Sequence, residues 1–194
     1  ILNIIESAAD LVDDFRDLGQ PDQGEILGRI AERLRTLFQG TEVKYEQIAL
    51  APFLRNVIQD ARSAMGQRTL LIVEDLDETL SIQMDRRILH LVVSGLLKNA
   101  IENTPDEGRI EIHAEDREDR VRIGVTDSGV GITDMNRDLI FGGFFHTVDT
   151  ELYSSKRPYA FNAGGAGADL LRMKVLSERL GFSIGFETRR CPHI

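Results

Sequence analysis

The chain has 194 residues, of which 42% are hydrophobic and 28% charged, as is usual for a soluble globular protein. Its formal net charge of −9 makes a nucleic-acid backbone an unfavourable partner. No apolar run approaches the roughly 20 residues of a membrane span. A single cysteine leaves no disulfide framework to build within the chain. The composition therefore predicts a cytoplasmic segment with no nucleic-acid partner and no membrane contact of its own.

The first 40 residues predict a helical hairpin. Apolar residues recur at steps of three and four over 1–18 and again over 27–37, which is the spacing of a packed helical seam. The turn residues of GQPDQG, 19–24, separate the two runs. Such a hairpin has little to pack against alone, so we expect 1–40 to be part of a dimerisation segment that pairs with a second copy. The alternative is a hairpin that packs only on its own domain.

A different pattern begins at Thr41 and predicts a second domain, residues 41–194. Predicted strands lie at 41–50, 69–76, 79–84 and 181–188, predicted helices at 51–66, 86–103 and 168–180, and a β-hairpin at 108–127. Asp85 is the predicted N-cap of the second of these helices. A loop-rich stretch over 128–167 is long enough to be a functional lid. The order of elements predicts an α+β fold, a two-layer α/β sandwich with a mixed sheet covered on one face by helices and preceded by an α-helical hairpin.

Two glycine clusters in this domain carry polar neighbours. In VTDSGVGI, 125–132, Asp127 ends a strand, and Gly129 and Gly131 permit a close backbone approach or a positive φ. A carboxylate in this place can accept a hydrogen bond from an exocyclic amine such as that of adenine, although a capped tight turn is the alternative. In FNAGGAGADLL, 161–171, glycines precede a helix, as in loops that lay backbone N–H groups against phosphate.

A third motif is LLKNAIENTP, 96–105. It puts Asn99 on a helix whose apolar residues face a core. A neutral amide oxygen in this position could bind Mg²⁺, which otherwise keeps its waters and is held by phosphates. The alternative is a solvated asparagine with no ligand.

Together these motifs resemble the ATP-binding catalytic domain of sensor histidine kinases, in the wider group that includes gyrase, Hsp90 and MutL. LLKNAIENTP is similar to the N box and DSGVGI to the G1 box. LIFGGFF, 139–145, is similar to the F box, and GGAGADLLRMKVLSERLGFSI, 164–184, to the G2 box. The four motifs stand in the family's order, and the resemblance covers residues from about 42 to 188.

The resemblance implies that the chain binds ATP and Mg²⁺, with Asn99 as the metal ligand and Asp127 as the adenine reader. Other expected nucleotide contacts are Asn103, Gly129, Gly131, Lys156, Arg157, Gly165, Gly167 and Arg172. The implied reaction moves the γ-phosphoryl group to a histidine and then to a response regulator. Because residues 1–18 contain no histidine, no catalytic residue is predicted, and we expect this segment not to phosphorylate itself at the family's site.

Three positions depart from the family. Gly95 stands where hydrolytic relatives such as gyrase carry a glutamate base, so transfer is favoured over hydrolysis. Glu102 occupies a position that is often basic, and the preceding Lys98 is expected to point elsewhere on the helix. Asp169 replaces the third glycine of the G2 box.

Asp169 is the most consequential of these departures. A unit charge about 4 Å from a phosphate costs about 4 kcal/mol at an effective dielectric near 20. A hydrogen bond to a charged phosphate stabilises binding by only about 1.5–3 kcal/mol. Asp169 therefore points away at the helix start, meets Mg²⁺, or weakens nucleotide binding, and we favour the first. The alternative functions are a non-catalytic nucleotide-sensing module with a degenerate site, and a helical scaffold that only transmits signals.

Overall fold

The computed structural model describes residues 43–129, 131–132, 137, 140–141, 159–161 and 168–189. The hairpin predicted over 1–40 lies outside the described residues, as does most of the 128–167 stretch. Four predicted nucleotide contacts also lie outside them, namely Lys156, Arg157, Gly165 and Gly167.

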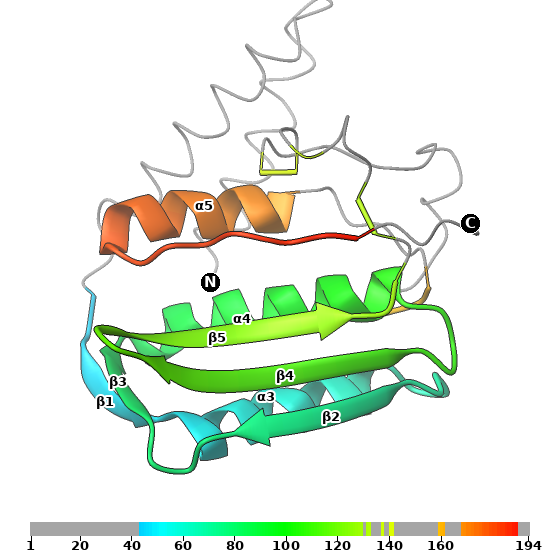
Figure 1. The fold of residues 1–194 in the computed structure, drawn as a ribbon, viewed down its shortest axis with the longest axis horizontal. Coiled ribbons are helices and arrows are strands. Elements are labelled where there is room, and N and C mark those ends of the chain that lie inside the picture. Colours follow the sequence, from blue (N-terminus) through cyan, green and yellow to red (C-terminus); the bar gives the residue numbers. More distant parts are fainter. Residues whose placement is uncertain are drawn as a thin grey trace, which may run out of the picture.

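The described elements follow the predicted order closely (Figure 1). They are β1 (Glu46–Ala49), α3 (Leu50–Ala64), β2 (Leu71–Leu76), β3 (Ser81–Met84), α4 (Arg86–Asn103), β4 (Arg109–Arg117), β5 (Arg120–Asp127) and α5 (Ala168–Leu180). The first predicted strand is shorter than expected, because only 46–49 pair with a neighbour.

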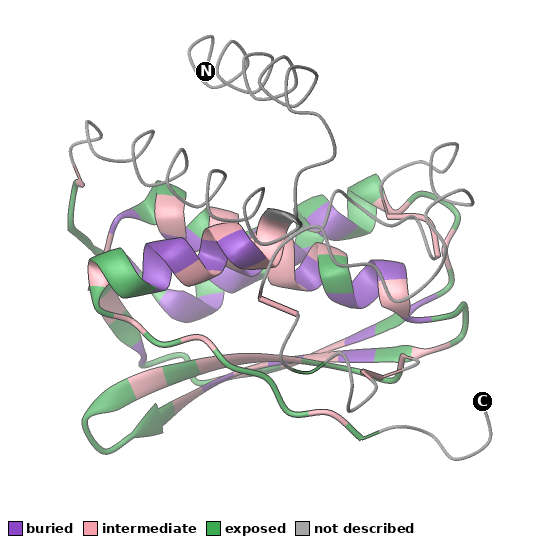
Figure 2. Ribbon diagram, turned by 90° about the horizontal axis from the view of Figure 1, so that it is seen from above, coloured by how far each residue is buried: buried purple, intermediate pink, exposed green. Residues whose placement is uncertain are grey.

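The main sheet is mixed, as predicted. Its strand order is β2-β4-β5, with β2 parallel to β4 and β4 antiparallel to β5. A separate two-stranded antiparallel sheet joins β1 to β3. Figure 2 shows the helices as one layer lying over one face of the sheet. The predicted two-layer sandwich is therefore confirmed.

The core lies between that helical layer and the inner face of the sheet. β4 shows why, because Ile110, Ile112 and Ala114 are buried while their neighbours are not, which is the period-two pattern of a half-buried strand. Facing them are buried residues of α3 and α4, among them Leu54 and Leu97. This packing fixes α4 against the sheet and presents its other face outward.

Asp85 begins α4, as predicted. Its carboxylate accepts a hydrogen bond from the backbone N–H of Arg87 at 2.9 Å and another from the backbone N–H of Lys44 at 3.0 Å. The Arg87 guanidinium also donates to it and holds the pKa of the buried Asp85 carboxyl well below its usual range. The N-cap thus fixes the helix that carries the N-box motif.

The predicted last strand over 181–188 is wrong. Gly181, at φ +74°, ends α5 in the left-handed conformation, and residues 182–189 then form neither helix nor strand. This segment runs alongside β5 in Figure 1 (red). The hydroxyl of its Thr188 accepts a hydrogen bond from the backbone N–H of Ile132 at 2.9 Å. The segment is thus held by a side-chain hydrogen bond, whereas a β-strand would be held by a series of backbone hydrogen bonds to its neighbour.

No helix in the described part of the chain combines the length and the apolar character needed to cross a membrane.

Candidate nucleotide site

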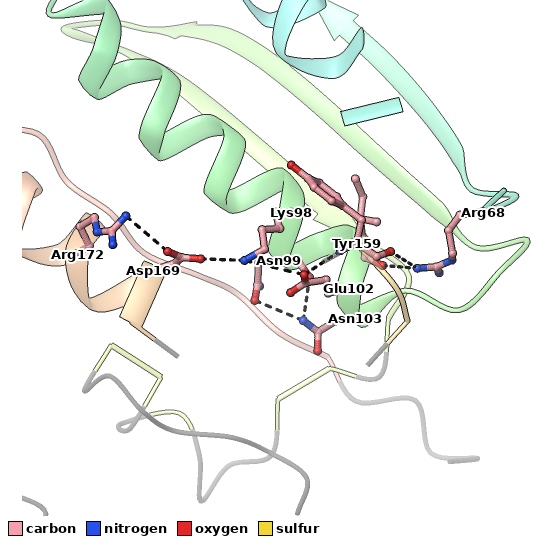
Figure 3. Close-up of polar contacts among 9 residues, drawn as sticks. Arg68, Lys98, Asn99, Glu102, Asn103, Tyr159, Asp169 and Arg172 are labelled. Atoms are coloured by element: carbon pink, nitrogen blue, oxygen red, sulfur yellow. Dashed lines mark hydrogen bonds and ion pairs between the residues drawn. The ribbon is translucent and has the colours of Figure 1, made fainter. Parts of the chain in front are cut away.

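The outward face of α4 carries both asparagines of the N-box motif. Asn99 is exposed, whereas Leu97 and Ala100 beside it are buried in the core. One turn later, the Asn103 amide donates to the backbone oxygen of Asn99 at 2.8 Å and approaches the Asn99 side-chain oxygen at 3.4 Å (Figure 3). The pair forms a polar strip at the C-terminal end of α4.

The G1 loop lies directly against that end of α4. A Cβ atom built at Gly129 would overlap the backbone oxygen of Asn103, so only glycine fits there. The Asp127 carboxylate accepts a hydrogen bond from the backbone N–H of Gly129 at 2.9 Å and is itself exposed. Gly131 has φ +71°, a conformation that favours glycine. The structure therefore places the loop that carries Asp127 against the Asn103 end of the polar strip.

Gly95 permits close packing of α4 against α5. A Cβ atom built at Gly95 would overlap the terminal methyl of Met173, and Met173 is buried. The space next to position 95, where a hydrolytic relative would place its glutamate, is filled here by an apolar side chain. A larger residue at this position would displace the Met173 methyl, which is the flexible end of that side chain.

Asp169 is paired with cations of two helices. Its carboxylate lies 3.2 Å from the Lys98 ammonium of α4 and 3.8 Å from the Arg172 guanidinium of α5. It also sits in the first turn of α5, where the helix dipole favours a negative charge. The expectation that Lys98 points elsewhere is wrong, because Lys98 and Glu102 are one helical turn apart and share a face, with the charged atoms 4.0 Å apart.

Glu102 binds the backbone of Tyr159. Its carboxylate is buried and accepts a hydrogen bond from the Tyr159 N–H at 3.1 Å. Burial raises the pKa of the Glu102 carboxyl, while that hydrogen bond and Lys98 partly oppose the change. On the other side of the same residue, Arg68 donates to the Tyr159 backbone oxygen at 2.9 Å. Figure 3 shows Tyr159 held between these two side chains.

Arg68 also ties this segment to the end of α4. Its guanidinium donates to the backbone oxygens of Thr104 at 2.5 Å and Ile101 at 3.2 Å and pairs with the Asp106 carboxylate. These are carbonyls that a helix end leaves without partners. Sequence reasoning missed Arg68 and Tyr159, since neither belongs to a motif and they are 91 positions apart, and only the fold brings them together.

A pocket of about 190 Å³ lies between α4 and α5. It is lined by Leu91, Ser94, Gly95, Lys98, Tyr159, Asp169, Arg172 and Met173. Arg172, which the sequence predicts to contact phosphate, lines this pocket. Lys98 and Arg172 supply its positive charges and Asp169 a negative one.

The side chains of this site could bind magnesium only together with a phosphate ligand. In the described part of the chain, no group of three or more His, Cys, Asp or Glu side chains could hold a metal by itself. Asn99 offers an exposed amide oxygen, and Mg²⁺ is commonly bound by one or two protein oxygens together with substrate phosphates and water. Asn99 thus suits the part that the motif assigns to it.

Several solved structures of histidine kinases share this fold. The mycobacterial sensor histidine kinase MprB matches with a TM-score of 0.57 and 19% identity, over 71% of this chain and 81% of MprB. Full-length ShkA in complex with AMPPNP matches with a TM-score of 0.64 and 21% identity, over 86% of this chain and 34% of ShkA. At these identities the matches show the fold, which the chain shares with histidine kinases of known structure.

Residues 84–190 match the model of the histidine kinase-, DNA gyrase B- and HSP90-like ATPase family, and the chain belongs to that family. The adaptive-response sensory kinase SasA of Rippkaea orientalis is 25% identical over 158 residues, 80% of this chain and 38% of SasA. The signal transduction histidine-protein kinase BaeS of Escherichia coli is 26% identical over 137 residues, 71% of this chain and 26% of BaeS. The chain therefore spans well under half the length of these curated relatives.

Proposed function

We propose that the chain is the catalytic part of a sensor histidine kinase, which binds ATP with Mg²⁺ and transfers the γ-phosphoryl group to a histidine outside residues 1–18. The observation that carries the proposal is the contact between the Gly129 backbone and the end of α4 at Asn103. Gly129 and Asn103 are 26 positions apart in sequence, so this contact brings two motifs together at one polar strip.

Each residue of the site has a distinct part in the proposed reaction. Asn99 would hold Mg²⁺, which supplies charge neutralisation for phosphoryl transfer. The Asp127 carboxylate would accept a hydrogen bond from the adenine amine, and the glycines beside it leave room for the base. Arg172 would contact phosphate, as would Lys156, Arg157 and the backbone at Gly165 and Gly167. The protein positions the reactants and stabilises charge, which is most of what this chemistry requires.

The three departures from the family motifs support a working site over a degenerate one. Met173 fills the space beside Gly95, Glu102 binds the Tyr159 backbone, and Asp169 is paired with Lys98. Each unusual residue has a specific partner, which is not expected of random loss. The absence of a carboxylate at position 95 favours transfer over hydrolysis.

The proposal extends to the partners and to the rest of the chain. Residues 1–40 would form part of a dimerisation hairpin that pairs with a second copy, and 41–194 would be the kinase domain. The phosphoryl group would pass from the histidine to an aspartate of a response regulator in the cytoplasm. The histidine kinase ThkA has been solved in complex with the response regulator TrrA, which supports a partner of that class.

A radiolabel transfer assay tests the proposal. The full-length protein that contains this chain is incubated with γ-labelled ATP and Mg²⁺, and the product is treated with acid and with base. We expect a phosphoprotein that is labile in acid and stable in base, as phosphohistidine is, and that loses its label to a response regulator. Mg²⁺-dependent ATP binding without labelling of the protein would favour the nucleotide-sensing module instead. Absence of ATP binding would favour the helical scaffold that only transmits signals.

A further inference from the structure

We propose that Lys98 binds the terminal phosphate of ATP, and that Asp169 holds the Lys98 ammonium at the pocket between α4 and α5 until nucleotide takes its place. The inference rests on the proposed ATP-binding function. It adds a phosphate ligand that none of the sequence motifs indicated, and it gives Asp169 a purpose.

The first support is the direction of the Lys98 side chain. Lys98 precedes the proposed metal ligand Asn99 in the chain, and its ammonium reaches across to α5, 3.2 Å from the Asp169 carboxylate. The side chain lines the pocket together with Ser94 and Arg172 and is 27% exposed. An ammonium has three donors, and the hydrogen bond to Asp169 uses one of them, so a phosphate in this pocket could be bound by the others.

The second support is the distribution of charge around the pocket. Lys98 and Arg172 are the two cationic side chains among its lining residues, and both are paired with Asp169. Position 102, on the same face of α4 as Lys98, carries a buried carboxylate committed to the Tyr159 N–H. Lys98 is therefore the side chain of α4 that can bring positive charge to a phosphate.

The third support is the ease of exchange between the two anions. The Asp169 side chain is 45% exposed, and an ion pair so open to water contributes little to stability. A terminal phosphate carries more negative charge and more acceptor oxygens, so its hydrogen bond to an ammonium is the stronger of the two. Lys98 can therefore leave Asp169 when ATP arrives and return after the phosphate has gone. This exchange would distinguish ATP from ADP, since ADP lacks the terminal group.

The test is a calorimetric titration of the chain with ATP and with ADP, both with Mg²⁺, on the wild type and Lys98→Gln. We expect Lys98→Gln to weaken ATP binding at least tenfold and to change ADP binding less than threefold. Lys98→Arg should restore most of the ATP affinity. Lys174→Gln is the matched control, because Lys174 of α5 pairs with Glu178 and does not line the pocket; it should leave both affinities unchanged.

Each result separates this inference from the proposed function. If the wild type binds ATP and Lys98→Gln has the same preference for ATP over ADP, the inference is overturned and the proposed function stands. An equal loss of ATP and ADP binding in Lys98→Gln and Lys98→Arg would also overturn it, because the role would then be structural. Failure of the wild type to bind either nucleotide would overturn the proposed function and this inference with it.

Discussion

The Glu102 carboxylate binds the backbone N–H of Tyr159, at 3.1 Å, across 57 positions of sequence. The acid is buried, and it lies on the same helix as the proposed metal ligand. The contact fixes residues 159–161 beside α4, next to the pocket that Tyr159 lines. A motif position that is often basic in the family has thus become an anchor for a distant part of the chain.

The raised pKa of Glu102 predicts a pH-dependent effect of Glu102→Gln. Burial raises the folded-state pKa above the unfolded value, so the folded protein holds the proton longer and loses stability as pH rises from the unfolded pKa through the folded one. Glutamine keeps an oxygen for the Tyr159 N–H and has no charge. The unfolding free energy of Glu102→Gln relative to wild type should therefore increase between pH 4 and pH 7, as measured by urea denaturation.

The control for this prediction is Glu178→Gln, which removes an exposed carboxylate from α5. Its difference from the wild type should stay nearly constant over the same pH range. A relative stability of Glu102→Gln that falls as pH rises would show that the charged form of Glu102 is the one the fold favours, and would contradict the prediction.

Arg68 should contribute strongly to stability. Its side chain is 10% exposed and donates to backbone oxygens at the end of α4 and at Tyr159. Removing a buried charged donor leaves those acceptors without partners. Arg68→Ala should lower the unfolding free energy by about 2–3 kcal/mol in urea denaturation. Arg109→Ala, which removes an exposed arginine paired with Glu111, should cost less than about 1 kcal/mol; equal costs would contradict the assignment.

The N-cap of α4 gives a separate prediction. Asp85→Ala removes the acceptor for two backbone N–H groups and for the Arg87 guanidinium. We expect the unfolding free energy to fall by about 1–2 kcal/mol at pH 7. Since the folded pKa of Asp85 is lowered, the wild-type advantage should shrink below about pH 4, as the carboxyl protonates. Asp119→Ala, at an exposed turn, serves as control, and a loss of similar size there would refute the N-cap account.

Asp169→Ala should change ATP affinity by less than fivefold. In the free protein the Asp169 carboxylate is paired with Lys98 and Arg172. When those cations turn to the phosphates, the N-terminal dipole of α5 still favours the negative charge of Asp169, so we expect its removal to lift only a small repulsion. Release of Lys98 should favour a small gain, and the gain should disappear in the Lys98→Gln background. A hundredfold gain in an ATP titration would mean that Asp169 faces the phosphates directly.

Most of the fold can be read from local pattern. The alternation in β4 and the cap at Asp85 are local signals, and both predictions are confirmed. The prediction of a last strand is wrong because alternation in 181–188 indicates only an extended segment. It does not show whether a neighbouring strand forms backbone hydrogen bonds with that segment. Gly131 could be predicted because its positive φ is a local requirement for glycine, whereas the close approach of Gly129 to Asn103 appears only in the folded chain.

The remainder of the site depends on contacts between distant residues. The direction of Lys98 is an exception, because its shared face with Glu102 follows from their spacing on α4 alone, whereas its ion pair with Asp169 depends on the packing of α5. Arg68 and Tyr159 carry no motif, and their pairing across 91 positions follows only from the packing of α4 on the sheet. The sequence shows that position 95 lacks a carboxylate, and the structure adds that the Met173 methyl packs against Gly95.

The central claim is that the strip formed by the end of α4 and the G1 loop binds ATP. The most direct measurement is calorimetric titration of the wild type and Asp127→Asn with ATP and Mg²⁺. Asparagine can still accept from the Gly129 N–H, but its amide group opposes the adenine amine. Asp127→Asn should bind at least tenfold more weakly than the wild type, and Asp116→Asn, at the exposed far end of β4, should match the wild type. Equal ATP affinity in Asp127→Asn and the wild type, or no binding by the wild type, would contradict the account.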